Sequence, residues 1–345
     1  MKTLLKIFTL GCIYLICQPI LAQTNTQLKN DFDKIIHSKH SFPFNGVVIV
    51  SKNGKTIYEK VNGFKNIEEK NLLKKNDQFE IMSNSKLFTS VLILKEVEKG
   101  KIDLQQSIKT YLPELSQSWA DSVTVHQLLN HTHGIKDITK PLLFKPGTEF
   151  KYGNYSNILL GKILFNVTHK TFRELATNLF KEIGLNETFV YSETEKHHLT
   201  QGYFFRNDSL IPNHQTLINE ENLPADGIIS TAKDLTKWDN LLHNGKILKP
   251  ETYQLLITPS TLSQHDAFGK TPQGYAYNIR NVHENSINYV GHTGLGDGFL
   301  AINIYFPKSK VSLVVLQNIM PDDTEDYYFY EKQFKNSLLK SALIK

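Results

Sequence analysis

Ser83 and Lys86 stand three residues apart at the start of an apolar stretch with helical spacing. Three residues along a helix place two side chains on one face, about 5–6 Å apart at Cβ. A serine hydroxyl is a weak nucleophile without a neighbouring base, and a lysine amine can be that base when burial or a nearby cation lowers its pKa. A helix start also directs backbone N–H groups towards a developing oxyanion. Serine is equally common as a helix N-cap, so this pair needs other residues before it indicates catalysis.

A second group of useful side chains is Tyr152-Gly153-Asn154, which follows a Pro-Gly pair at 146–147. A tyrosine whose pKa of about 10 is lowered by neighbouring cations can relay a proton. An asparagine amide can both donate to and accept from a substrate amide. The alternative is that Tyr152 is a half-buried loop aromatic and Asn154 a turn or cap residue.

The third group, His292-Thr293-Gly294, lies just before a predicted strand. At the edge of a sheet, a polar side chain and open backbone groups can hold an extended substrate. Gly294 would let the substrate approach the backbone closely. The alternative is a plain turn, because glycine recurs at positions 291, 294, 296 and 298.

The elements needed to position these groups follow from the hydrophobic pattern. The predicted elements are a helix over 25–39, a hairpin over 46–62 that turns at Asn53-Gly54, a helix over 83–99, a mostly helical stretch over 104–200 interrupted by prolines, a helix over 232–243, strands over 299–306 and 311–315, and a closing helix over 325–343. Strands therefore gather at both ends of the chain and helices in the middle. One sheet built from the two ends, covered by the terminal helices and interrupted by a helical region, fits this order.

Composition excludes several classes of protein. The 345 residues are 40% hydrophobic and 21% charged, as in a globular protein of one large or two ordinary domains. The formal net charge of +5 falls to +3 without Lys2 and Lys6, which lie in a segment expected to be removed. So small a charge, without a basic cluster, argues against nucleic acid as a partner. Both cysteines, Cys12 and Cys17, lie in that same segment, so a catalytic cysteine, a cysteine-bound metal and a disulfide are excluded from the mature chain.

Residues 1–22 have the features of a secretory signal peptide: a basic start, a short apolar middle from Ile7 to Cys17, and a small residue before a polar stretch. Cleavage is expected after about Ala22, although Ile20 fits the cleavage pattern less well than alanine would. The alternative is a membrane anchor, but the apolar run is shorter than the roughly 20 residues that span a bilayer. The mature protein is therefore predicted to be exported, to have no stable membrane span and to be, most simply, periplasmic.

Together the three groups resemble the serine β-lactamase and penicillin-binding protein superfamily, with its Ser-x-x-Lys, Ser-Asp-Asn and Lys-Thr-Gly elements. The Tyr-x-Asn and His-x-Gly forms resemble the branch that contains class C β-lactamases, D-alanyl-D-alanine carboxypeptidases and related esterases. The resemblance runs over about 42–320, with the motifs in the right order. Connecting stretches that also match lie at 123–134, 146–147, 159–161 and 226–235.

The resemblance implies three catalytic residues. Ser83 would be the nucleophile that forms an acyl-enzyme, and Lys86 would help to remove its proton. Tyr152 would carry that proton to the leaving group and later activate water. The offset from the matching stretches selects Tyr152 over Tyr155, which begins a rival Tyr-x-Asn three residues later.

The resemblance also implies a set of substrate-binding groups. Asn154 would bind the substrate amide, and His292, with Thr293 and Gly294, would face the far end of the substrate. The backbone N–H groups of the nucleophile and of Leu295 would form the oxyanion hole, in which one donor is worth about 3–4 kcal/mol.

Histidines mark the departures from the pattern. His292 replaces a lysine that would supply a fixed positive charge, and a histidine with a pKa of about 6.5 is mostly neutral at neutral pH. This weakens the case for a penicillin or cephalosporin and favours an ester or a peptide. His133 stands where serine is usual. With His126 and His131 it could bind a metal, but gaps of five and two residues do not place all three on one helix face, so no metal or other cofactor is expected.

The sequence thus predicts a mixed α/β (α+β) protein with a β-lactamase/transpeptidase-like fold, an antiparallel sheet flanked by helices plus an inserted all-helical region. A signal peptide over 1–22 would precede one β-lactamase-related domain over 23–345, with its sheet part at about 23–82 and 200–345 and its helical part at about 83–199. The predicted activity is serine hydrolysis of a small molecule or peptide through an acyl-serine: a β-lactam, a D-amino-acid peptide or a small ester. The alternative is a non-catalytic cell-wall-binding or sensor protein on the same fold. The oligomeric state stays open.

Overall fold

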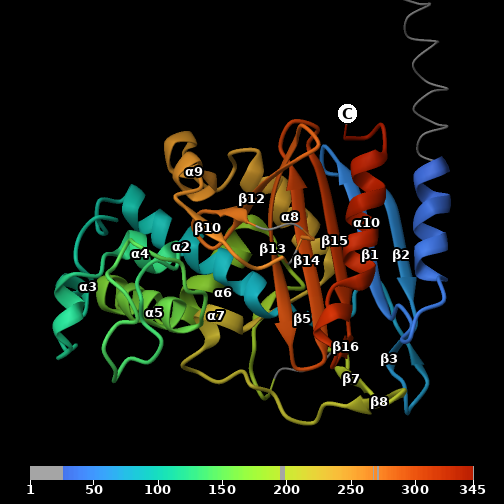
Figure 1. Ribbon diagram of the computed structural model, residues 1–345, viewed down its shortest axis with the longest axis horizontal. Coiled ribbons are helices and arrows are strands. Elements are labelled where there is room, and N and C mark those ends of the chain that lie inside the picture. Colours follow the sequence, from blue (N-terminus) through green and yellow to red (C-terminus); the bar gives the residue numbers. More distant parts are fainter. Residues whose placement is uncertain (1–25, 195–198, 267, 270–271, 345) are drawn as a thin grey trace, which may run out of the picture.

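The computed structural model describes residues 26–194, 199–266, 268–269 and 272–344, so the predicted signal peptide lies outside the described residues. Its centre is an eight-stranded sheet with the strand order β10-β11-β12-β13-β14-β15-β1-β2, in which all neighbours are antiparallel (Figure 1). The strands are β1 (Gly46–Lys52), β2 (Lys55–Asn62), β10 (Thr261–Ser263), β11 (Gln273–Tyr275), β12 (Arg280–Glu284), β13 (Ile287–Gly296), β14 (Phe299–Phe306) and β15 (Val311–Gln317). Because β1 pairs with β15, the two ends of the chain meet in one sheet, as the sequence predicted.

The hairpin of β1 and β2 shows how local sequence starts this sheet. Asn53 and Gly54 at its turn have φ angles of 52° and 75°, which asparagine and glycine adopt at the least cost. Side chains of β1 alternate between the two cores, with Val48 on one face of the sheet and Ile49 on the other. The predicted hairpin is therefore confirmed.

Helices cover both faces of the sheet (Figure 1). The helix over residues 26–36 and the closing helix α10 (Phe329–Lys340) share one face, where the rings of Phe32 and Phe334 lie 4.8 Å apart. On the other face, α8 (Ala232–His243) packs against β1 and β15. Burial of apolar side chains on both faces explains why the central strands are hydrophobic along their whole length.

The helical region lies beside the sheet, on the left in Figure 1. Its helices are α2 (Ser85–Glu98), α3 (Ile108–Tyr111), α4 (Val125–Leu129), α5 (Tyr155–Thr168) and α6 (Phe172–Ile183), with a 3-10 turn at Ser118–Asp121. Helix α2 is buried along most of its length and belongs to the same apolar core as the neighbouring face of the sheet. Residues 130–154 form no helix or strand, and this long loop carries Tyr152.

The structure also contains short elements that the hydrophobic pattern did not predict. They are a sheet of β5 (Phe79–Glu80), β9 (Ile228–Ser230) and β6 (Phe189–Val190); a sheet of β16 (Ile319–Pro321), β7 (Tyr203–Arg206) and β8 (Ser209–Pro212); the pair β3 (Phe64–Asn66) and β4 (Asn71–Leu72); the helices α7 (Leu223–Asp226) and α9 (Pro250–Ile257); and a 3-10 turn at Thr324–Asp326. Most of these elements are too short for hydrophobic periodicity to show. No helix in the described part of the chain is long and apolar enough to cross a membrane.

Candidate active site

Ser83 lies in a 3-10 turn, Met82–Asn84, directly before α2 rather than inside the predicted helix. Met82 has a φ of 48°, a left-handed conformation that costs a non-glycine residue about 1–3 kcal/mol. The neighbouring backbone holds this bend, because the N–H of Ile81 donates to the carbonyl of Ile228 at 3.2 Å. The bend leaves Ser83 half-buried at the wall of a cavity.

Lys86 is fully buried one turn further along, and its ammonium has three acceptors. Its Nζ lies 2.8 Å from Ser83 Oγ, 3.2 Å from Asp226 Oδ1 and 3.2 Å from the carbonyl oxygen of Ala225. Burial alone would lower the pKa of Lys86, but the negative charge of Asp226, together with the neighbouring Tyr152, outweighs burial and raises it. Lys86 is therefore a charged donor to the Ser83 oxygen in this arrangement, whereas the sequence analysis expected it to help remove the proton.

Asp226 is the first of two residues that the sequence analysis missed. It is buried, accepts a hydrogen bond from Ser83 Oγ at 3.1 Å, and pairs with Lys86 through the same carboxylate oxygen. Its other oxygen accepts from Asn154 Nδ2 at 2.5 Å. One carboxylate thus joins three of the predicted site residues. The sequence signal was weak, since Asp226 stood only as the first residue of a matching stretch.

Side chains of α2 hold Asp226 in place. Thr89 Oγ1 donates to the carbonyl of Pro224 at 2.6 Å, and the N–H of Ile228 donates to Ser85 Oγ at 2.9 Å. With the Lys86 bond to Ala225, these contacts fasten α7 and the start of β9 against the first turns of α2. The position of Asp226 is therefore set by the same helix that positions the serine.

The ring of Tyr152 lies next to Lys86. The Lys86 ammonium lies 5.3 Å from the centroid of the Tyr152 ring, and Tyr152 lines the same cavity as Ser83. Its ring packs against His131, with centroids 4.7 Å apart, and stacks on His292 at 6.0 Å. The Tyr152 hydroxyl is buried and makes no hydrogen bond with the described residues. It therefore has hydrogen-bonding capacity left for a substrate.

The rival motif at 155–157 points elsewhere. Tyr155 is exposed, at 36% of its surface, whereas Tyr152 lines the cavity. Asn157 is buried and donates to Asn278 Oδ1 at 3.2 Å, away from Ser83. The geometry therefore agrees with the choice of Tyr152 and Asn154.

His292 is buried and stacks on the ring of Tyr152. It is 1% exposed, its Nδ1 lies 2.7 Å from the carbonyl of Thr293, and its Nε2 lies 3.2 Å from the hydroxyl of Tyr275. Burial, and next the positive charge of Arg280, lowers the pKa of His292 well below 6.5. It is a neutral packing partner of the phenol.

Strand β13 brings Thr293, Gly294 and Leu295 to the serine. β12 pairs with β13 only as far as Gly291, so the rest of β13 runs past the end of β12 and lies against the turn that carries Ser83. A Cβ at Gly294 would lie 2.1 Å from the carbonyl oxygen of Ile81, which explains the glycine. Thr293 and Leu295 line the cavity with Ser83.

Arg280 is the second residue that the sequence analysis missed. It begins β12, is 3% exposed and lines the cavity that Ser83 lines. Its guanidinium lies 5.7 Å from the ring centroids of Phe268 and Tyr275, and one nitrogen lies 3.4 Å from Thr293 Oγ1. Its Nε has no hydrogen-bond partner within the described residues. A buried guanidinium with free donors at a cavity is suited to an anionic group.

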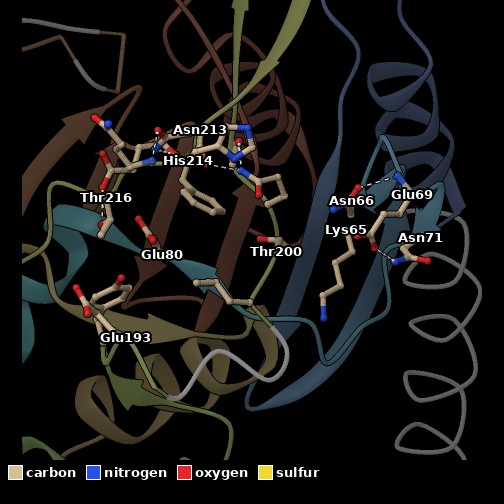
Figure 2. Close-up of a pocket in the computed structure, with 17 residues that line it drawn as sticks. Lys65, Asn66, Glu69, Asn71, Glu80, Glu193, Thr200, Asn213, His214 and Thr216 are labelled. Carbon is tan, nitrogen blue, oxygen red and sulfur yellow. Dashed lines mark hydrogen bonds between the residues drawn. The ribbon is translucent and has the colours of Figure 1, made fainter.

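Ser83 and Tyr152 border a cavity of about 620 Å³, a size that suits a small molecule or the end of a peptide. Its lining residues are Ser83, Tyr152, His265, Asp266, Arg280, Thr293, Leu295, Thr324, Glu325, Tyr327, Tyr328 and Lys332. A second cavity, of about 680 Å³, is lined partly by Asp297, the residue just beyond the end of β13. Figure 2 shows Glu80 and Glu193 on one side of this second cavity and Lys65 on the other.

The structure gives His133 a role that the sequence did not. Its Nδ1 accepts from the N–H of Ile135 at 2.9 Å and so closes a turn. A serine hydroxyl two residues before an N–H can accept in the same way, which explains the usual serine. His131 instead contacts Asn278 and Ser156. Within the described ranges, no three His, Cys, Asp or Glu side chains are arranged to hold a metal ion.

Several histidines are buried as neutral rings. Burial is the largest cause in each case: it lowers the pKa of His133 to about 4 and that of His243 to about 3, and lowers those of His131 and His292 well below 6.5. In the unfolded chain these rings would titrate at about 6.5. They therefore bind protons on unfolding below that pH.

We predict that the free energy of unfolding falls as the pH is lowered from about 6.5 to about 4. Each proton taken up on unfolding removes about 1.4 kcal/mol per pH unit. Asp239 and Glu331, whose pKa values burial raises to about 7, act in the opposite sense, as does Asp297, whose pKa burial also raises. They are three groups against six histidines, because burial lowers the pKa of His126 and His265 as well. Denaturant unfolding at several pH values checks this. His133→Ser keeps an acceptor for the turn and should make the free energy of unfolding depend less steeply on pH. An unchanged pH dependence in this variant would contradict the prediction.

Comparison with known proteins gives three kinds of match. A sequence model of the family described as Beta-lactamase matches residues 43–333. Protein flp of Staphylococcus aureus (strain N315) is 27% identical over 328 residues; the match covers 85% of this chain and 64% of flp, so the chain spans less than two thirds of that relative. Penicillin-binding protein 4* of Bacillus subtilis (strain 168) is 25% identical over 343 residues, covering 88% of this chain and 72% of that protein.

Among solved structures, the chain is similar to a D-amino acid amidase from Ochrobactrum anthropi SV3 complexed with D-phenylalanine. The TM-score is 0.79 and the identity 19%, with 91% of this chain and 100% of the amidase covered. At this level of identity the likeness concerns the fold alone.

Proposed function

The chain belongs to the Beta-lactamase family, as its three motifs and its fold indicated, and on this premise we propose that it is an exported serine hydrolase whose nucleophile is Ser83. The observation that carries the proposal is the contact between Lys86 Nζ and Ser83 Oγ at 2.8 Å, beside the Tyr152 hydroxyl, which has no hydrogen-bond partner among the described residues. Export rests on the pattern of residues 1–22.

In the proposed reaction, the Ser83 oxygen attacks the carbonyl carbon of an ester or amide. A C–O bond forms, the bond to the leaving group breaks, and the hydroxyl proton ends on the leaving group. Water then hydrolyses the acyl-enzyme, which releases the acid and restores the serine. The Lys86 ammonium stabilises negative charge on the serine oxygen, and the backbone N–H groups of Ser83 and Leu295 are the proposed oxyanion hole.

Tyr152 is the proposed proton carrier. The Lys86 ammonium donates hydrogen bonds to Ser83, Asp226 and Ala225, and its raised pKa keeps it protonated. It therefore cannot accept the serine proton. The Tyr152 ring lies next to this ammonium and Tyr152 lines the cavity, while its buried hydroxyl has no partner in the described structure. It can pass a proton to the leaving group as it takes the proton of Ser83. In deacylation it can take a proton from the incoming water as it returns one to the Ser83 oxygen.

Arg280 supplies the fixed positive charge that His292 lacks. It lies at the start of β12, against Thr293, and lines the cavity beside the serine. This charge favours substrates with a carboxylate on the leaving-group side, including β-lactams and peptides with a free C-terminus. Neutral esters would not use it.

A panel of substrates tests the proposed function. β-Lactams, D-amino-acid peptides and short esters are offered to the protein, and both product release and the lifetime of the adduct are measured. A β-lactamase would release its acyl group quickly, whereas a penicillin-binding protein would keep it; one factor of ten in that rate is only about 1.4 kcal/mol of barrier. Hydrolysis of at least one class supports the proposal, and inertness towards all three refutes it.

Replacing Arg280 by glutamine should lower kcat/KM for carboxylate-bearing substrates by about 10- to 100-fold, because a charge-assisted hydrogen bond is lost. Hydrolysis of p-nitrophenyl acetate, which has no carboxylate, should stay within a few-fold of the wild type. Lys332→Gln is a matched control, since Lys332 borders the same cavity but is paired with Asp266 at 4.0 Å. Equal losses for charged and neutral substrates would show that Arg280 only supports the fold.

A further inference from the structure

Resting on the proposed function, we infer that Asn278 is a positioning residue for the proton carrier, Tyr152. The side-chain amide of Asn278 joins the backbone of Lys86 to the ring of His131. Tyr152 packs against this ring. Neither Asn278 nor His131 lines the cavity that Ser83 lines, so the two act through the phenol and not on a substrate.

The first step concerns the backbone at position 278. Asn278 lies between β11 and β12, is fully buried and has a φ of 53°. Its N–H donates to the carbonyl of Leu129 at 3.0 Å. Asparagine is one of the few residues that adopt this left-handed conformation readily, and its amide can both donate and accept. The connection between the two strands therefore places a polar group at a fixed point in the interior.

The second step concerns the contacts of the Asn278 amide. Nδ2 lies 3.2 Å from the Lys86 carbonyl oxygen, 2.8 Å from Ser90 Oγ and 3.0 Å from Asn157 Oδ1. Oδ1 accepts from Asn157 Nδ2 at 3.2 Å and lies 2.9 Å from His131 Nε2. One side chain thus connects helix α2, helix α5 and the long loop between α4 and α5.

The third step concerns the proton on His131. A carbonyl oxygen can only accept, so Asn278 Oδ1 requires the ring hydrogen on His131 Nε2. Nδ1 is then the acceptor, and it lies 3.2 Å from Ser156 Oγ. Burial lowers the pKa of His131 well below 6.5, so the ring stays neutral. Contacts at both nitrogens therefore fix its orientation.

The fourth step leads from His131 to the phenol. The ring centroids of His131 and Tyr152 lie 4.7 Å apart, and the His131 carbonyl accepts from the N–H of Lys151 at 2.9 Å. Residues 130–154 form no helix or strand, so contacts of this kind hold the Tyr152 ring 5.3 Å from the Lys86 ammonium. A misplacement of about 1 Å in a catalytic group can cost roughly 100-fold in rate. Loss of the Asn278 amide should therefore impair proton transfer by Tyr152.

Two esters of one acid test this role. p-Nitrophenyl acetate and ethyl acetate give the same acyl-enzyme, and kcat/KM reports its formation. Nitrophenolate leaves without a proton, whereas the ethyl leaving group needs one from Tyr152. Asn278→Gly removes the amide and keeps the φ of 53° at no cost. Its kcat/KM should fall by about 10- to 100-fold more for ethyl acetate than for p-nitrophenyl acetate.

Further variants separate positioning of the phenol from support of the fold. In a Tyr152→Phe background, Asn278→Gly should change kcat/KM for ethyl acetate by less than about threefold, because the hydroxyl through which it acts is already gone. His131→Gln keeps a donor for Asn278 Oδ1 but lacks the ring, so it should show the same dependence on the ester, and it tests the inference even if Asn278→Gly does not fold. Asn207→Gly, the same change at an exposed residue with a φ of 50°, should behave like the wild type.

Three results would overturn the inference. The first is an equal loss for the two esters in Asn278→Gly and His131→Gln, and the second is a full further loss in the double variant, since both indicate a role in the fold alone. The third is a wild type that cleaves p-nitrophenyl acetate but not ethyl acetate, because it would lack proton transfer to the leaving group. Absence of fluorophosphonate labelling of the wild type would instead refute the proposed function itself.

Discussion

Replacing Ser83 by alanine is expected to reduce hydrolysis of every substrate by roughly 10⁴-fold or more. The change removes the oxygen that accepts from Lys86 at 2.8 Å and donates to Asp226 at 3.1 Å, so no acyl-enzyme can form. Ser83 is half-buried and one oxygen is lost, so the fold should survive. Rates with p-nitrophenyl acetate and nitrocefin, measured beside the unfolding temperature, check both parts.

Ser337→Ala in α10 is a suitable control, because it makes the same change outside the cavity that Ser83 lines. It should retain full activity. If the Ser83 variant kept more than a few per cent of wild-type hydrolysis, another residue would have to be the nucleophile.

Replacing Lys86 by methionine is expected to lower activity by about 10³-fold and to destabilise the protein by about 3–5 kcal/mol. Methionine removes the donor to Ser83 and leaves Asp226 as a buried charge without its cation. Removing one partner of a buried ion pair costs this much because the other charge stays desolvated. Steady-state kinetics and denaturant unfolding measure the two losses separately.

Two further variants distinguish the loss of stability caused by an unpaired buried charge from the loss of catalytic activity. Lys95→Met lies on the same helix but removes a partly exposed ion pair with Glu182, so its cost should stay below about 1 kcal/mol. Combining Lys86→Met with Asp226→Asn should recover much of the stability but none of the activity. Recovery of activity in the double variant would mean that Lys86 acts only as a counter-ion.

Residues with a local signal were predicted from the sequence. The hairpin at Asn53-Gly54 follows from two residues that accept positive φ, and the helix over 232–243 follows from its apolar spacing. The Ser-x-x-Lys spacing placed Ser83 and Lys86 together because one helical turn fixes their separation. Tyr152 needed the family resemblance, since its loop has no periodicity that relates it to the serine.

Residues without a local signal were not predicted. Asp226 is 143 positions from Ser83, and only the contacts between α7 and α2 bring the two together. Arg280 reaches the site because it is the first residue of β12 and pairs with Gly291, the point beyond which β13 continues without β12. This position is set by the register of the two strands. The charge state of Lys86 depends on Asp226, so spacing alone could not reveal that its pKa is raised. Long-range contacts therefore decide the electrostatics of this site.

Locating the covalent adduct shows directly which residue is the nucleophile. The protein is treated with a fluorophosphonate or a penicillin, digested, and the modified peptide is sequenced by mass spectrometry. We predict one added group per chain, on the oxygen of Ser83, and none in the Ser83→Ala variant. An adduct on any other residue, or one that persists in the variant, would contradict the account.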